Sequence, residues 1–209
     1  MVGPMLVEVI QTTPSVWAVV AACVAILALF LLVTYLICRQ FSKGTDPFKH
    51  WPFYLSAVVG LILLLRFGVS LTTVKGMILT LIMLYASLQD LKSHEVPNCI
   101  PIMILILAFV GFKSSDLLSM LCGATVVFVP VLATTILNPE HPLGGADIKI
   151  STALAFLLGV EKGLFALLIG MLLAVVVTTI SNKINQKDQK EPFAVVPYLW
   201  IGAALAYMI

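Results

Sequence analysis

Asp90 and Asp147 are the two acidic residues of this sequence whose surroundings best suit chemistry. Asp90 ends an apolar stretch and begins the polar sequence Asp-Leu-Lys-Ser-His-Glu-Val-Pro-Asn, residues 90–98. Asp147 follows the turn-like sequence Pro-Leu-Gly-Gly-Ala, residues 142–146, and precedes a second apolar stretch. Two carboxyl groups held close together cannot both ionise easily, so the pair keeps one proton over a broad pH range. Such a pair can activate water as a base and protonate a scissile carbonyl as an acid.

The residues beside the two aspartates place both at the ends of helices. The apolar run before Asp90 predicts a helix that ends there, and Pro97 is expected to start the next helix, where its missing N–H is tolerated. Gly144 and Gly145 permit unusual backbone angles and a close approach of the chain. We therefore expect Asp147 in the first turn of a helix, where the helix dipole favours a carboxylate.

The elements that must position these aspartates are apolar throughout. Hydrophobic residues make up 61% of the 209 positions and charged residues 11%, against roughly 25% charged in a typical soluble domain. We therefore predict an all-α, polytopic transmembrane helix bundle in contact with the lipid bilayer. A net charge of only +2 predicts no nucleic-acid partner. The first fourteen residues lack Lys and Arg, so the first apolar run is expected to remain as a membrane segment.

Apolar runs predict about eight spans in a single domain, residues 1–209. A spanning helix needs about 20 mainly apolar residues, and shorter runs are expected to be extended by polar turns or to lie in thinned bilayer. The spans are expected at residues 16–38, 52–71, 75–91, 98–112, 117–137, 148–160, 163–182 and 193–208.

The distribution of Lys and Arg predicts an orientation, because these residues are retained on the cytoplasmic side. We predict that the N-terminus is external, because this orientation puts most of the cations inside. The inner side then has Arg39, Lys43, Lys49, Lys92, Lys149, Lys183, Lys187 and Lys190. The outer side has Lys75, Lys113 and Lys162, and Arg66 lies in the outer part of the second span. This orientation places Asp90 and Asp147 at the same depth, on the cytoplasmic side of a cell's inner membrane.

No cofactor is expected, and the cysteines do not indicate a metal site. None of the four cysteines, Cys23, Cys38, Cys99 and Cys122, forms a C-x-x-C pair. We interpret them as small apolar residues rather than as zinc ligands or a disulfide framework.

Three segments of the sequence resemble the type IV prepilin peptidases, a family of membrane aspartic proteases of the G-x-G-D class. Residues 90–92, Asp-Leu-Lys, with residues 96–98, Val-Pro-Asn, look like its first active-site motif. Residues 144–149, Gly-Gly-Ala-Asp-Ile-Lys, look like its second. Residues 192–202, Pro-Phe-Ala-Val-Val-Pro-Tyr-Leu-Trp-Ile-Gly, are similar to its C-terminal Pro-Phe-x-Pro-x-Leu-x-x-Gly segment. The resemblance covers residues 75–209.

The sequence departs from the family pattern at two places, and residues 1–74 are less family-like. Ala146 stands where G-x-G-D has its second glycine, which suggests that this position needs a small residue more than a positive φ. Phe193 and Pro197 are also farther apart than in the family.

The resemblance implies an aspartic endopeptidase with Asp90 and Asp147 as its catalytic pair. Its substrates would be prepilin-like precursors (pilins, pseudopilins or archaellin-like proteins), cut after a short basic leader at the cytoplasmic face. Residues expected to bind substrate or support the pair are Lys92, Pro97, Asn98, Gly144, Gly145 and Lys149. The family's methyltransferase region carries two C-x-x-C pairs that this sequence lacks, so N-methylation is not expected.

Other functions and roles remain open from the residues alone. Asp90 and Asp147 could be ion sites of a small proton- or ion-coupled transporter, although such sites usually lie near the midplane between repeats. A structural assembly component would leave the paired motifs unexplained. Lys149 could tune the pair or simply mark the inner interface. His94 and Glu95 could position a leader or be solvated turn residues.

Overall fold

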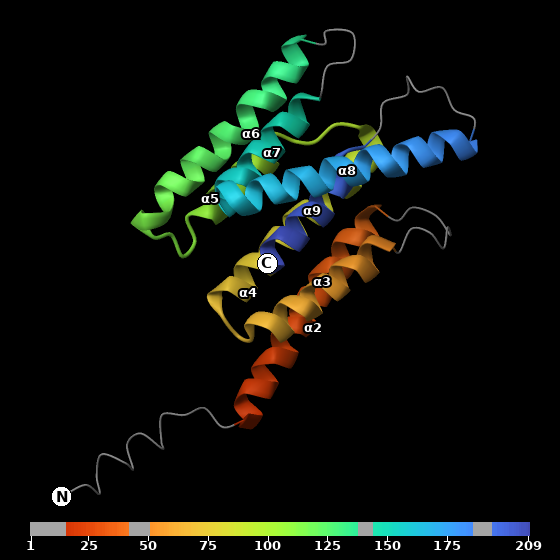
Figure 1. The fold of residues 1–209 in the computed structure, drawn as a ribbon. Coiled ribbons are helices and arrows are strands. Elements are labelled where there is room, and N and C mark those ends of the chain that lie inside the picture. Colours follow the sequence, from red (N-terminus) through yellow and green to blue (C-terminus); the bar gives the residue numbers. More distant parts are fainter. Residues whose placement is uncertain (1–15, 42–50, 138–143, 186–193) are drawn as a thin grey trace, which may run out of the picture.

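All the regular secondary structure in the described part of the chain is helical. The computed structural model describes residues 16–41, 51–137, 144–185 and 194–209 (Figure 1). These residues form α2 (Val16–Phe41), α3 (Trp51–Phe67), α4 (Leu71–Ser93), α5 (Cys99–Ala108), the short 3₁₀ helix η2 (Ser114–Asp116), α6 (Leu117–Leu137), α7 (Gly145–Leu158), α8 (Val160–Asn185) and α9 (Val196–Met208). The prediction of an all-α fold is confirmed for these residues.

Helices α4 and α9 lie at the centre of the arrangement. Helices α2 and α3 pack on one side of α4, and α5 and α7 lie on the other side (Figure 1). Helix α8 runs along α9, and α6 covers α7 and α8. Neighbouring segments of the sequence are therefore mostly neighbours in space, as in other helix bundles.

Four helices within the described residues are long and apolar enough to cross a membrane, namely α2, α4, α6 and α8. Three others, α3, α5 and α9, are apolar but shorter. Each of the eight predicted spans therefore overlaps an α-helix of the structure. Four of these helices, within the described residues, are long enough to cross a membrane.

The bundle has two ends, which we name by their residues. The aspartate end contains Asp90, Asp147 and Val196, where α4 ends and α7 and α9 begin. The opposite end, the distal end, contains Lys75 and Tyr207, where α4 begins and α9 ends. At the distal end the Tyr207 hydroxyl donates to the carbonyl of Thr72 at 2.8 Å, which ties α9 to α4.

Tight turns at the distal end correct two predicted boundaries. Helix α4 begins at Leu71, not at residue 75, because the Ser70 hydroxyl accepts the N–H of Thr73 and caps the helix. The predicted spans at residues 148–160 and 163–182 leave a loop at residues 161–162, and this loop is wrong: Gly159 alone, at φ 79°, joins α7 to α8. A positive φ is easily adopted only by glycine, so this one-residue turn requires it.

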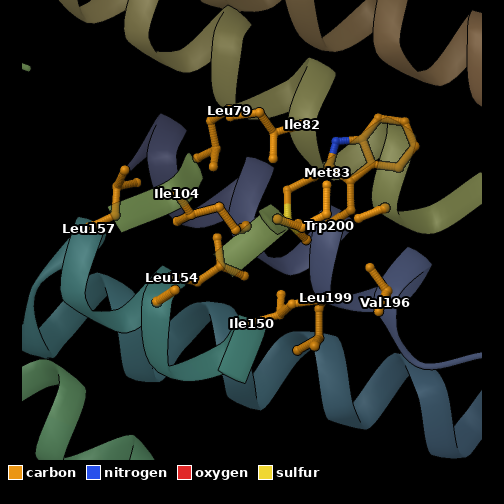
Figure 2. Close-up of a cluster of buried hydrophobic side chains, with 14 of the residues drawn as sticks. Leu79, Ile82, Met83, Ile104, Ile150, Leu154, Leu157, Val196, Leu199 and Trp200 are labelled. Carbon is orange, nitrogen blue, oxygen red and sulfur yellow. The ribbon is translucent and has the colours of Figure 1, made fainter. Parts of the chain in front are cut away.

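A buried cluster joins the helices that carry the aspartates. Met83 of α4, Ile104 of α5, Leu154 of α7 and Trp200 of α9 meet there, each 2% exposed or less (Figure 2). Because lipid tails are as apolar as these side chains, close packing rather than exclusion from water favours their association. The cluster fixes the ends of α4 and α7 relative to each other.

Candidate active site

Asp90 continues the buried face of α4. Met83 and Ser87 precede it at helical spacing, and all three side chains are buried, with Asp90 only 6% exposed. The helix ends three residues later, and His94 is its C-cap in the left-handed conformation, at φ 52°. The N–H of His94 donates to the Asp90 carbonyl at 2.9 Å. The carboxyl group is therefore held in the last turn of a packed helix, not in a solvated loop.

The N-terminus of α9 supplies the hydrogen-bond partner of Asp90. The backbone N–H of Val196 donates to Oδ2 of Asp90 at 3.0 Å. Val196 begins α9, and the N-cap residue Val195 makes no side-chain capping bond. The first N–H groups of a helix lack partners within the helix, so Asp90 serves as the cap of α9. This bond and the dipole of α9 favour the ionised form of Asp90, whereas burial of the carboxyl group and its place in the last turn of α4 favour the protonated form.

Asp147 lies in the first turn of α7, as the sequence predicts. Gly144 is the N-cap of this helix, and a Cβ atom added to Gly144 would lie 2.9 Å from Oδ2 of Asp147. A Cβ added to Gly145 would meet nothing within 4 Å. The Asp147 carboxyl group therefore folds back over Gly144, which leaves no room there for a Cβ atom. Gly145 has room for one.

The two carboxyl groups are close enough to interact. Asp147 lies outside the four helices of spanning length. Burial and, to a smaller extent, the negative charge of Asp90 together raise the pKa of the Asp147 carboxyl from 3.8 to about 6. The structure thus brings together the two aspartates that the sequence singled out. Asp90 accepts an N–H bond, whereas Asp147 holds a proton more readily than an ordinary aspartate.

The residues predicted to support the pair lie in different places. Asn98 and Lys149 meet, because the Lys149 ammonium donates to Oδ1 of Asn98 at 2.8 Å and joins the start of α5 to α7. Lys92 turns away, with its ammonium 5.8 Å from the ring centroid of Phe41 at the end of α2. Pro97 does not start α5, which begins at Cys99.

The turn before α5 explains the correction at Pro97. The Pro97 carbonyl accepts the N–H of Ile100 at 3.1 Å, so Pro97 lies before the helix and closes its first turn.

Residues Pro192 and Phe193 of the third motif lie outside the described residues. Of its remainder, Ala194 and Val195 are buried just before α9, and the helix begins at Val196.

Val196 is the contact that the sequence analysis missed. Its contribution is a backbone N–H, which no residue type reveals. The available signal was Pro197, since proline is typical of the first positions of a helix and so marks a helix N-terminus here.

The apolar helices of spanning length fit a membrane protein. At the aspartate end, the site has two carboxyl groups between which protons can move. Residues 77–179 match the model of the type IV leader peptidase family, and this segment contains both aspartates. This segment, which carries the site, belongs to that family, and the match supports a type IV leader peptidase-like protease. No curated protein and no solved structure matches it.

Proposed function

We propose that this protease is an aspartic endopeptidase that removes the short basic leader of prepilin-like precursors, with Asp90 and Asp147 as its catalytic pair. The observation that carries the proposal is the proximity of these two carboxyl groups, inside the segment that matches the family. The comparisons give no support to a proton- or ion-coupled transporter.

Different surroundings give the two carboxyl groups different roles in this mechanism. Asp90, stabilised as an anion by the Val196 N–H, takes a proton from water as the water oxygen attacks the scissile carbonyl carbon. Asp147, which keeps its proton up to a pH of about 6, donates it to the carbonyl oxygen. The tetrahedral intermediate then breaks its C–N bond. The leaving nitrogen receives the proton from Asp90, and one hydroxyl group of the intermediate returns its proton to Asp147, which leaves a carboxylic acid and an amine. The pair titrates as a unit, so these roles describe one microstate.

The position of the pair supports a substrate cut at the membrane boundary. Asp90 lies in the last turn of α4 and Asp147 in the first turn of α7, so neither is in the middle of its helix. A precursor with an apolar helix in the bilayer and a polar leader outside would present its junction there. Unpaired backbone groups are costly in hydrocarbon, so a bond at the boundary is easier to expose. A glycine before that bond would let the carboxyl groups approach closely.

Co-expression with candidate prepilin-like precursors tests the proposal. Cleavage is followed as a size shift, with the parent chain, Asp90→Asn, Asp147→Asn and Glu95→Gln. Both asparagine variants should abolish the shift while still accumulating in the membrane, and Glu95→Gln, in an exposed turn, should retain it. A precursor with a bulky residue in place of the glycine should remain uncut. Normal cleavage by either asparagine variant would remove that aspartate from the mechanism.

Action at the cytoplasmic face is part of the proposal and depends on orientation. Among the described cations, Arg39, Lys92, Lys149 and Lys183 lie in helix turns on the aspartate side of their helices, and Arg66, Lys75, Lys113 and Lys162 lie on the distal side. The expected excess therefore rests on Lys43, Lys49, Lys187 and Lys190, which lie outside the described residues.

Reporter fusions test this orientation. Fusions after residues 45 and 187 should read cytoplasmic, and a fusion after residue 114 should read external. An external signal at residue 187 would contradict cytoplasmic cleavage and leave the catalytic pair unaffected.

A further inference from the structure

A cavity at the distal end has no part in the proposed cleavage. It has a volume of about 380 Å³ and is lined by charged, aromatic and aliphatic side chains, among them Lys75, Lys162, Asp116, Tyr207 and Leu71. A second cavity of about 200 Å³ shares Lys75 and Asp116 with it. Lys75 precedes Asp90 by fifteen residues on α4, so the cavity lies about 22 Å from the aspartates along that helix.

Lys75 is fixed at the wall of this cavity by the end of α5. Its ammonium donates to the carbonyl of Ala108 at 3.2 Å and to that of Val110 at 3.0 Å. Ala108 is the last residue of α5 and Val110 lies in the turn that follows, where backbone acceptors lack helical partners. A lysine ammonium has three donors, and these two bonds leave one for a ligand while holding the positive charge in place.

Lys162 faces the same cavity but has no comparable structural task. It is exposed, and within the described residues no hydrogen bond or ion pair joins it to another side chain. It lies in the first turn of α8, where the helix dipole disfavours a cation. Helix stability therefore does not explain its position, whereas an anion in the cavity would be attracted both by Lys162 and by the start of α8.

The remaining walls indicate what kind of anion fits. Asp116 opposes the two lysines, which leaves one net positive charge around the cavity. The apolar wall includes Phe67, Leu71 and Leu157, and Leu71 is 57% exposed. Cationic pockets between apolar helices near a membrane surface suit lipid headgroups, whose phosphate takes the charge while the acyl chains follow the apolar wall. A small soluble anion would leave that wall unused.

We propose that the Lys75–Lys162 cavity binds the phosphate of an anionic phospholipid headgroup at the membrane interface opposite the aspartates. Phosphate oxygens accept from the two ammonium groups, and the glycerol and acyl chains pass over Leu71. The site is independent of the proposed protease substrate, because no lining residue belongs to the aspartate end.

Native mass spectrometry of the full chain, released from detergent micelles, tests this site. The probes are phosphatidylglycerol and phosphatidylcholine with identical acyl chains, each added to the parent, to Lys162→Gln and to Lys113→Gln. Lys113 is an exposed lysine at the same end that does not line the cavity, so it is the matched control. Lys162→Gln should weaken phosphatidylglycerol binding about fivefold, the equivalent of about 1 kcal/mol for one lysine near a membrane surface. The control should bind as the parent does, and phosphatidylcholine should bind weakly to all three.

Two further arms decide the nature of the ligand. Asp116→Asn should strengthen phosphatidylglycerol binding, because it removes the charge that opposes the phosphate. Weaker binding would mean that the Asp116 carboxylate supports the ligand, and it would overturn the proposal. Inorganic phosphate, added alone, should not displace the lipid. Displacement that depends on Lys162 would show that free phosphate is the ligand. Equal binding of phosphatidylglycerol by the parent and Lys162→Gln would also refute the site.

Discussion

The backbone N–H of Val196 donates to Oδ2 of Asp90 at 3.0 Å, across 106 residues of sequence. This bond connects the start of α9 to the end of α4 and makes the side chain of Asp90 the cap of another helix. Asp90 therefore has a structural task as well as the proposed catalytic one. The two tasks require different properties, since capping needs an acceptor oxygen and catalysis needs an ionisable group.

Substitutions of Asp90 should separate these tasks. Asp90→Asn keeps an acceptor for the Val196 N–H, so we expect nearly unchanged thermal stability with cleavage slowed by about 10²–10⁴-fold. Asp90→Ala removes the acceptor as well and leaves a buried N–H without a partner. It should lower the free energy of unfolding by about 1 kcal/mol more than Asp90→Asn does. Melting of purified protein in detergent, with cleavage measured in parallel, checks both expectations. Equal melting temperatures for the two variants would contradict the capping role.

The glycines before Asp147 should respond differently to the same substitution. Gly144→Ala would place a Cβ 2.9 Å from the Asp147 carboxyl oxygen and displace that group, whereas Gly145→Ala meets nothing within 4 Å. We expect cleavage to slow about tenfold for Gly144→Ala, since a 1 Å displacement of a catalytic group can cost about 10²-fold. Gly145→Ala should be active and no less stable, because alanine favours a helix more than glycine does.

Gly144→Ser distinguishes displacement from loss of helix stability. Serine is a favoured N-cap residue, yet it carries the same Cβ toward Asp147. This variant should therefore be as stable as the parent and as slow as Gly144→Ala. Full activity in Gly144→Ser would show that the glycine is not needed for the position of the carboxyl group.

The positions of the helices could be predicted from apolar runs, but their ends depended on contacts that the sequence does not display. Lys75 was expected to be the first residue of the third span. In the structure it lies within α4, since the carbonyls of Ala108 and Val110 bind its ammonium. Glu161 and Lys162 suggested a loop, whereas a single glycine makes the turn and both charges fall in the first turn of α8.

The candidate site was predictable to the extent that it depends on residue types. Asp90 and Asp147 stand out because acidic residues beside turn sequences are few in so apolar a chain. The contact between Asn98 and Lys149 joins two motif residues that the sequence could name but not pair. The Val196 N–H was not predictable, because a backbone donor is present at nearly every position.

The glycine that ends the third motif should be required for the packing of α9 on α8. A Cβ on Gly202 would collide with the carbonyl oxygen of Ala166 and lie 2.9 Å from the N atom of Gly170. Both are backbone atoms and cannot move aside as a flexible side chain would. We expect Gly202→Ala to lower the free energy of unfolding by about 1–3 kcal/mol, as overpacking does. Leu205→Ala on the exposed face of α9 is the control and should change stability by less than about 0.5 kcal/mol. A melting temperature of Gly202→Ala equal to that of the parent would contradict the close contact between the two backbones.

The raised pKa of Asp147 gives cleavage a defined pH dependence. Because the pKa lies at about 6 instead of 3.8, Asp147 is protonated and able to act as an acid below that pH. The proton is lost as the pH rises through it. The rate of cleavage should therefore fall as the pH rises above about 6, a range in which ordinary solvated aspartates are already ionised.

Infrared difference spectra of the protonated carboxyl stretch, with Asp147→Asn as the blank, give the titration midpoint of Asp147 directly. In Asp90→Asn the midpoint should move down, because a negative charge is removed, yet stay above 3.8, because burial is the larger cause of the shift. A midpoint near 3.8 in the parent would mean that water reaches Asp147 freely. A midpoint unchanged by Asp90→Asn would mean that the two carboxyl groups do not interact, and the mechanism proposed for the pair would then fail.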